Sequence, residues 1–290
     1  MTGTPIAPGA GTGVRCVDLH MHSTASDGSL SPEAVVGAAA AAHLAAIALT
    51  DHDSVGGIAS AREAGARLGV RIVTGVELSA IDADGEAHLL GLHLTRLEAI
   101  ERHLAVFRES RRARAGRIVE RLRALGIPVT VDAVLAEAGD AAIGRPHVAR
   151  ALVAGGWAKD LRDAFDRLLG NGRPAFVPKY RLTLGEAIGI VHDAGGLAVL
   201  AHPGPSGTRA RLEALRGDGL DGVEVLHPGH SSEDIARLSA LTEHLGLLPS
   251  GGSDWHGAKA GPRLIGVMRV PEMWLVRQDD RLRASAANVA

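Results

Sequence analysis

The sequence predicts an α/β barrel of mostly parallel strands that carries a helical insert. Short runs rich in Val, Ile, Leu and Ala alternate with segments of helical periodicity, as expected for strands buried on both faces with helices between them. About six or seven such units within 290 residues fit a barrel better than an open sheet. From about residue 96 to residue 181 the strand-like runs stop, and only helical patterns remain.

The first half of the barrel is expected to contain four strands and two helices. The strands are predicted at 14–19, 47–50, 70–75 and 87–94, and the last returns beside the third across a turn at 82–85. The first helix, 32–43, has Ser31 as its N-cap and Pro32 at its first position. The second helix, 55–68, is expected to be capped by Asp53 or Ser54.

The second half repeats this alternation. Strands are predicted at 197–201, 222–226, 247–250 and 264–267, and helices at 183–194, 209–216 and 232–245. The predicted barrel therefore comprises residues 14–95 and 182–278. Residues 1–13 are expected to be a flexible N-terminal tail, and residues 279–290 a C-terminal tail.

Residues 96–181 are expected to form a helical subdomain inserted between two barrel strands. A long Arg-rich helix at 98–125 opens it, and shorter helices are predicted at 131–138, 146–154 and 158–169. The long helix also carries several glutamates, so a solvated face with ion pairs is the first interpretation. A basic lip that attracts polyanionic substrates is the alternative.

The composition is that of an ordinary enzyme. The net charge of −2 argues against bulk nucleic-acid binding, and the single cysteine, Cys16, excludes an internal disulfide and thiolate metal clusters. No apolar run reaches the roughly 20 residues needed to cross a bilayer, and the first 13 residues do not have the pattern of a signal peptide. We therefore expect a cytoplasmic protein without a membrane partner.

Residues of the types that bind metals follow the apolar runs in a fixed order. His20 and His22 are two positions apart, so both imidazoles project from the same side of an extended segment and can converge on one cation. The full candidate set is His20, His22, Asp27, His52, Glu77, His88, His202, Asp254 and His256. We place Glu77, His88, His202, Asp254 and His256 at the C-terminal ends of predicted strands, where α/β barrels form their sites. A mixed histidine and carboxylate set suits manganese, zinc or iron.

A longer series of motifs surrounds these residues. In chain order they are DLHMHSTASDGSLSPEAVV, ALTDHDSVGG, GVELSA, AHLLGLHL, IGRPHVARAL, FVPKYRLTLGEAI, AHPG, GVEVLHP and GGSDWHG. On these motifs the chain, over about 14–267, resembles the PHP-domain (polymerase and histidinol phosphatase) metal-dependent phosphoesterases. Within that superfamily it is most similar to nucleoside 3′,5′-bisphosphate phosphatases and related 5′→3′ exoribonucleases.

The resemblance implies a distorted seven-stranded barrel with two or three divalent metal ions, for which we expect manganese, with zinc or iron as alternatives. Carried over position by position, the ligands are His20, His22, Glu77 and Asp254 for the first metal, Asp27, His52 and His256 for the second, and Glu77, His88 and His202 for the third. His93 competes with His88, which we prefer because it matches the family's position. Asp254, Glu77 and His52 are expected to act in catalysis through the metals.

The expected chemistry is hydrolysis by a metal-activated hydroxide. Neighbouring divalent ions lower the pKa of a bridging water and neutralise charge that builds up on the phosphate oxygens. The sequence offers no evident Ser-His-Asp arrangement for a covalent nucleophile. Asp51 and Asp53 flank His52 and are expected to orient it rather than to act directly as acids.

Substrate recognition is expected to involve basic residues that are not ligands. Arg145 and His147 open a predicted helix of the insert, where free backbone N–H groups favour phosphate. Lys179 lies where the chain re-enters the barrel, and His230, close to His227, follows a barrel strand. Many relatives place an Arg directly after His-Pro-Gly, but this chain has Pro205 there, so either Arg209 reaches back or that contact is missing.

The first hypothesis for function is hydrolysis of the 3′-phosphate of a nucleoside 3′,5′-bisphosphate such as pAp. The first alternative is a 5′→3′ exonuclease on short RNA or DNA oligonucleotides, but aromatic residues make up only 2% of the chain and offer few stacking platforms. The others are a histidinol-phosphatase-like monoesterase and, from a different class, a non-catalytic metal-stabilised PHP binding module. We expect a small nucleotide as partner and no obligate protein partner.

Overall fold

The computed structural model describes residues 15–138, 143–178 and 181–287. The chain divides into two compact units, of which the first is formed by Met1–Leu97 together with Thr183–Ala290, and the second by Glu98–Leu182. The second unit is therefore an insertion between the two halves of the first. The tail predicted for residues 1–13 lies outside the described residues.

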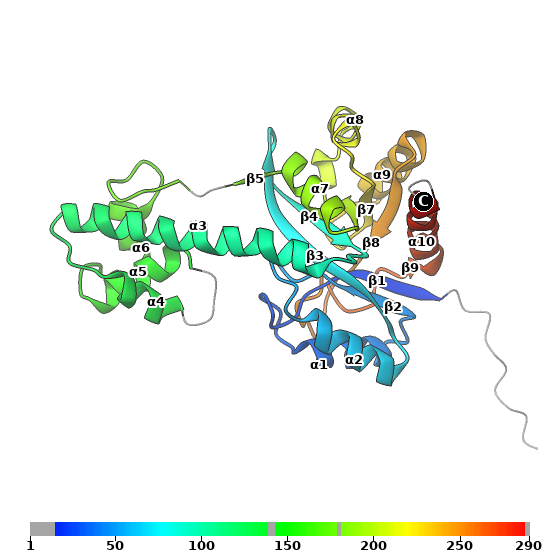
Figure 1. Cartoon of the computed structure of the whole chain (residues 1–290), viewed down its shortest axis with the longest axis horizontal. Coiled ribbons are helices and arrows are strands. Elements are labelled where there is room, and N and C mark those ends of the chain that lie inside the picture. Colours follow the sequence, from blue (N-terminus) through cyan, green and yellow to red (C-terminus); the bar gives the residue numbers. More distant parts are fainter. Residues whose placement is uncertain (1–14, 139–142, 179–180, 288–290) are drawn as a thin grey trace, which may run out of the picture. The chain divides into compact units, whose positions relative to one another are not determined.

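The first unit contains a sheet that curls into a barrel (Figure 1). Its strands are β1 (Cys16–Met21), β2 (Ala46–Leu49), β3 (Arg71–Asp82), β4 (Gly85–Leu92), β6 (Leu197–Leu200), β7 (Gly222–Leu226), β8 (Leu248–Gly251) and β9 (Val270–Pro271). They follow one another in the order β8-β7-β6-β4-β3-β2-β1-β9. β4 is antiparallel to β3 and β6, β9 is antiparallel to β1, and the other pairs are parallel. The predicted class, a distorted seven-stranded barrel of PHP type, is confirmed, with β9 as a short addition beside β1.

The barrel closes where the chain leaves β8 and meets the end of β1. Met21 pairs with Trp255 in a parallel bridge, and the His22 N–H donates to the Trp255 carbonyl at 2.9 Å. Gly252 permits this approach, because a Cβ at that position would lie 2.4 Å from the Cβ of His20. The segments that carry the first and the last candidate ligands are thereby held side by side.

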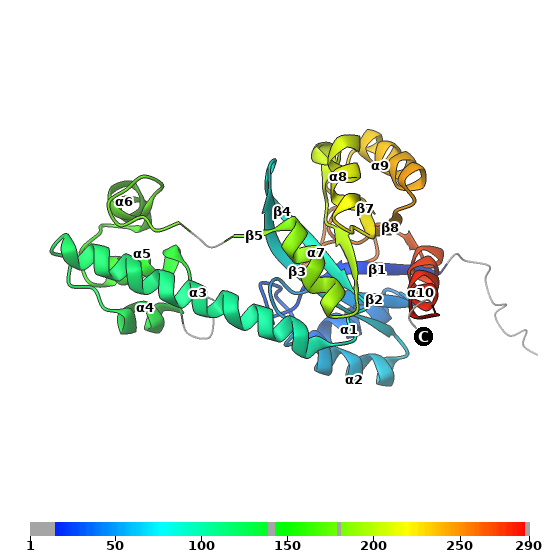
Figure 2. The same ribbon diagram turned by 45° about the horizontal axis from the view of Figure 1, so that its top comes forward.

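Helices follow the strands and cover the barrel (Figure 2). They are α1 (Pro32–Ala41), α2 (Ile58–Leu68), α7 (Leu184–Asp193), α8 (Arg209–Gly217), α9 (Ser232–Leu245) and α10 (Glu272–Ala287), with the two-residue strand β5 (Leu182–Thr183) before α7. α1 packs on α2, α7 on β4, α9 on β7 and α10 on β8. The core between them consists of small aliphatic residues, among them Val17, Leu19, Ala48, Val73, Leu90 and Val199. Such a core agrees with the scarcity of aromatic residues.

The second unit has its own apolar core. Most of it is formed by α3 (Leu97–Ala124), α4 (Val131–Ala138), α5 (Arg145–Ala154), α6 (Leu161–Ala164) and a π-helical turn (Phe165–Leu169). Ile118, Leu122, Val134, Val148, Leu152 and Leu169 are among its buried residues. The helix predicted to begin at 158 begins later, because Asp160 accepts a hydrogen bond from the Asp163 N–H at 2.8 Å and caps α6.

Two local predictions in the barrel were wrong. Residues 264–267 are not a strand, since residues 265–268 form turns, and the strand of this region is β9, further along the chain. The N-cap of α2 is Gly57 rather than Asp53 or Ser54. Asp53 instead accepts a hydrogen bond from the Ser79 N–H at 3.0 Å, so it anchors its turn to β3.

The prediction of a C-terminal tail at 279–290 was wrong for residues 279–287, which belong to α10, and residues 288–290 lie outside the described residues. The middle of α10 is tied to the barrel: the Asp279 carboxylate accepts two hydrogen bonds from Arg71 at 2.7 and 2.6 Å. The buried Gln278 lies 3.0 Å from His93 Nε2. Across the described ranges, no helix is long and apolar enough to span a membrane, and the cytoplasmic location stays a prediction.

Candidate metal centre

The nine predicted ligands all lie in the first unit. Six of them follow β1, β2, β6 or β8, whereas His20, Glu77 and His88 lie within β1, β3 and β4. Nitrogen and carboxylate oxygen atoms form three groups, each with its atoms within 4.8 Å of one another: His20, His22, Glu77 and Asp254; His22, Asp27, His52 and His256; and His52, Glu77 and His88. His202 Nε2 lies beside the third group, 3.1 Å from Glu77 Oε1.

Glu77 is the residue that joins these groups. Its Oε2 lies 3.0 Å from His20 Nε2 and 3.1 Å from His22 Nε2, and its Oε1 lies 2.7 Å from His88 Nδ1. Burial alone would raise the pKa of Glu77, but the charge and hydrogen bonds of its histidine neighbours hold that pKa well below its usual value. Glu77 is therefore an ionised carboxylate with both oxygens aimed at histidines.

Glu77 and His88 were predicted to stand at the C-terminal ends of strands, but the structure places them inside β3 and β4. The reason is that β3 and β4 form one long antiparallel ribbon in which Ser79 is opposite His88. The first half of β4 therefore lies beside the second half of β3. His93, the competitor of His88, is bonded to Gln278 and is not a member of any of the three groups.

The histidine nitrogens have the environment of metal ligands. Both ring nitrogens of His22, and Nδ1 of His52 and His88, are buried without a hydrogen-bond partner in the described structure. Carboxylate oxygens of Glu77 nevertheless lie 2.7–3.2 Å from three of these atoms. Buried polar atoms without partners are costly and rare, and a shared cation would satisfy them. The residues present therefore fit divalent metal ions.

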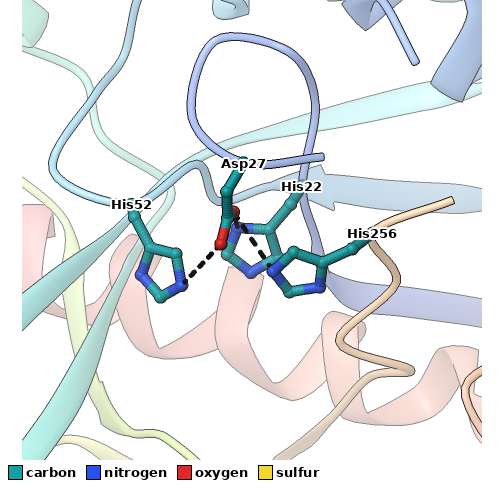
Figure 3. Close-up of side chains that lie close together, drawn as sticks. All are labelled: His22, Asp27, His52 and His256. Atoms are coloured by element: carbon teal, nitrogen blue, oxygen red, sulfur yellow. Dashed lines mark ion pairs between the residues drawn. The ribbon is translucent and has the colours of Figure 1, made fainter. Parts of the chain in front are cut away.

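The second group gathers around Asp27 (Figure 3). Asp27 Oδ1 lies 3.2 Å from His256 Nε2, and Oδ2 lies 4.0 Å from His52 Nε2. His22 Nδ1 is 3.8 Å from Asp27 Oδ1, whereas its Nε2 lies nearer to Glu77 and Asp254. The nearer contacts favour His22 as a ligand of the first group.

The sequence suggested that Asp51 orients His52, but in the structure the carboxylate of Asp51 bonds to other residues. It accepts hydrogen bonds from the Ser23 N–H at 2.7 Å, the Ser23 hydroxyl at 2.8 Å and the Ser26 hydroxyl at 2.7 Å. These bonds fix the loop between β1 and α1. Asp51 therefore positions Asp27 rather than His52.

Glu224 is a residue of the centre that the sequence analysis missed. It is fully buried in β7; its Oε1 lies 3.1 Å from His20 Nδ1, and its Oε2 accepts the His202 N–H at 2.7 Å. A carboxylate that accepts the Nδ1–H of a histidine leaves Nε2 free to bind a metal. His202 and Asp254 both have positive φ, 29° and 49°, which is strained for residues other than glycine and typical of functional sites.

Protons compete with metals at this centre. Burial alone would lower the pKa of His20, but the charges of Glu77 and Glu224 raise it well above its usual value. The pKa values of His22 and His88 are also raised: burial opposes the shift, and the nearby carboxylates of Glu77 and, for His22, Asp254 outweigh it. Protonation thus stabilises the metal-free protein fully below about pH 6.5, and this stabilisation is lost as the pH rises through the raised values.

Metal affinity should have the opposite pH dependence, because a metal binds neutral imidazole. We expect Mn²⁺ to bind more weakly as the pH falls from about 8 to about 6, with roughly one proton or more released per ion near neutral pH. Calorimetric titration in two buffers of different ionisation enthalpy measures this release. A pH-independent affinity without proton release would contradict the expectation.

A cavity of about 420 Å³ opens onto the three groups. Besides ligands, it is lined by Pro203, Gly204, Pro205, His227, Gly229, His230 and Arg263. His230 has both ring nitrogens engaged, by the Gly204 N–H at 3.1 Å and the Val225 carbonyl at 2.9 Å, so it holds two loops together. The sequence analysis gave Arg263 no role, and no motif marks it; in the structure its guanidinium pairs with Asp254.

The other predicted substrate residues are not among those that line this cavity, or lie outside the described residues. Arg209 is exposed, donates to Glu213 at 2.7 Å and does not line the cavity. Arg145 and His147 belong to the second unit, at the start of α5, where His147 Nδ1 accepts the Gly144 N–H at 2.9 Å. Lys179 lies outside the described residues.

Comparison with known proteins agrees with this centre. The PHP domain family matches residues 18–112. The 3′,5′-nucleoside bisphosphate phosphatase of Chromobacterium violaceum is 38% identical over 257 residues, which cover 86% of this chain and 90% of the relative. The 5′-3′ exoribonuclease Rnm of Escherichia coli is 38% identical over 247 residues, covering 82% and 84% of the two chains.

A solved structure shows the same fold. It comes from Bifidobacterium adolescentis, is assigned to the metal-dependent phosphoesterases and superposes with a TM-score of 0.67 at 34% sequence identity. The match covers 92% of this chain and 96% of that one. The chain therefore belongs to the PHP-domain family and is a metal-dependent phosphoesterase, a hydrolase of phosphate esters.

Proposed function

We propose that this protein removes the 3′-phosphate of nucleoside 3′,5′-bisphosphates such as pAp. The observation that carries the proposal is the set of three ligand groups that share residues beside one cavity of about 420 Å³. That volume lies toward the small end of the range for small-molecule sites, about 300–1,000 Å³. A single nucleotide suits such a cavity better than a nucleic-acid strand.

We propose manganese as the metal, since the mixed histidine and carboxylate donors suit it, as they do zinc or iron. Bound divalent ions supply a water of lowered pKa as nucleophile and neutralise phosphate charge. The ions would be held by three sets of residues: His20, His22, Glu77 and Asp254 for one, Asp27, His52 and His256 for another, and Glu77, His88 and His202 for a third. Glu224 fixes the orientation of His20 by accepting its Nδ1–H.

The second phosphate of the substrate is proposed to be held by Arg145, His147 and Lys179. The Arg145 guanidinium packs over the rings of Phe165 and Phe176, at 5.7 and 5.4 Å from their centroids. This packing fixes the arginine at the beginning of α5, where the backbone N–H groups of a helix favour anions. The similarity to the Chromobacterium violaceum phosphatase supports the same substrate class.

Exonuclease activity on short oligonucleotides is the second candidate, supported by the equal similarity to the Escherichia coli exoribonuclease. Strand-binding clefts commonly stack successive bases on aromatic rings. Among the described residues that line the cavity there is no Phe, Tyr or Trp. We therefore place this activity second.

The test compares three substrates with the Mn²⁺-loaded protein: pAp, a 5′-phosphorylated RNA pentamer and histidinol phosphate. We expect inorganic phosphate and AMP from pAp, with kcat/KM at least about tenfold higher than for the pentamer, a difference of roughly 1.4 kcal/mol in barrier. Faster release of mononucleotides from the pentamer would make the exonuclease the main activity. Turnover of histidinol phosphate alone would refute the nucleotide assignment.

A further inference from the structure

Arg263 is the single arginine or lysine among the described residues that line the cavity. Arginine keeps its charge at every physiological pH, whereas the other basic residues of the lining are histidines, several of them candidate metal ligands. We propose that Arg263 binds the phosphate group of the substrate inside this cavity. The inference rests on the proposed function only in taking the ligand to be a phosphate ester.

The ion pair with Asp254 holds the guanidinium at the cavity without blocking the metal centre. Asp254 Oδ1 lies 3.5 Å from His20 Nε2 and 3.3 Å from His22 Nε2, within the first ligand group. The other oxygen, Oδ2, pairs with Arg263 NH1 and lies 3.5 Å from His227 Nε2. One carboxylate oxygen of Asp254 thus faces the histidines of the first ligand group, and the other forms the ion pair with Arg263.

This arrangement leaves most of the guanidinium available. An arginine has five N–H donors, and in the described structure Asp254 is the partner of one nitrogen, NH1. The Arg263 side chain is 49% exposed. The planar fork of a guanidinium matches two oxygens of a phosphate, which a lysine ammonium cannot do.

Among the described residues around the cavity, Arg263 supplies the permanent positive charge, in addition to the charge that bound metal ions would bring. The turn after β6 contributes Pro203, Gly204 and Pro205 to the lining, and the Gly204 N–H is already bonded to His230. Glu77 and Asp254 both present carboxylates to the cavity. Arg263 therefore takes the place at the phosphate that the sequence analysis left open at Pro205 and Arg209.

The competing explanation is that Arg263 only positions Asp254. Two variants separate the explanations: Arg263→Gln removes the charge, and Arg263→Lys keeps the charge without the fork. Lys259→Gln is the matched control, because Lys259 is exposed in the same loop and does not line the cavity. Calorimetry gives the Kd of Mn²⁺ for each protein, and then the Kd of inorganic phosphate for each Mn²⁺-loaded protein.

We expect Arg263→Gln to weaken phosphate binding roughly 10- to 100-fold, as for loss of a charge-assisted hydrogen bond, while the Kd of Mn²⁺ changes less than about threefold. The lysine variant should be intermediate, and the control should match the wild type. Weakened Mn²⁺ binding with unchanged phosphate affinity would overturn the inference, as would a wild-type protein that binds no phosphate. Because binding is measured without turnover, failure on pAp would refute the proposed function and leave this result standing.

Discussion

Glu77→Gln should lower phosphate-ester hydrolysis by roughly 10³-fold or more while the barrel remains folded. The estimate takes a loss of several kcal/mol of metal stabilisation at 1.36 kcal/mol per tenfold in rate. Glu77 is buried, and its two oxygens reach His20, His22, His52, His88 and His202. A glutamine keeps the shape but offers one acceptor oxygen, no charge, and an NH₂ group that repels a cation.

The same variant should also lose bound metal. Mass spectrometry of dialysed protein should show at least one ion fewer per chain than in the wild type, because Glu77 belongs to two of the three ligand groups. Glu63→Gln, at an exposed position on α2, is the matched control for the change of charge. Unchanged metal content together with unchanged turnover would show that the hydrolytic centre lies elsewhere.

The barrel could be predicted from the sequence because its strands are buried on both faces and read as apolar runs. The long strand β3 shows where this signal ends. Its first half, with Val73, continues the apolar pattern, but Glu77 and Ser79 interrupt the second half, which runs on to Asp82. A strand that carries a site residue thus resembles a loop, because a side chain such as Glu77 faces the candidate metal centre rather than the apolar core.

The candidate ligands that the structure brings together could be named from the sequence because each stands in a short local motif, whereas Glu224 could not. Glu224 lies in the middle of the run GVEVL, and its partner His20 is 204 positions away in the sequence. Only the closed barrel, in which β8 lies between β7 and β1, brings Glu224 into contact with His20. Arg263 was missed for a related reason, since its contact with Asp254 depends on the path of a loop that has no periodicity.

Glu224→Gln should weaken Mn²⁺ binding roughly 10- to 100-fold, the usual effect of losing a partner that orients a ligand. The two Glu224 oxygens accept from His20 Nδ1 and from the His202 N–H. A glutamine has one acceptor oxygen, so one of these bonds must be lost, and its NH₂ group faces a donor. Either His20 loses the partner that fixes its tautomer, or the backbone N–H of His202, a residue with positive φ, loses its hydrogen bond to residue 224.

Because Glu224 acts by orienting the metal ligands, excess metal should compensate for the activity that is lost with Glu224. We expect excess Mn²⁺ to restore kcat of Glu224→Gln to within about threefold of the wild type, whereas Glu77→Gln should stay inactive at any metal concentration. Nitrogen-15 NMR of the metal-free protein, at a pH above the raised pKa of His20, should show a less uniform His20 tautomer. Glu243→Gln, exposed on α9, controls for the lost charge. A loss of kcat that excess Mn²⁺ does not repair would mean that Glu224 takes part in the reaction itself.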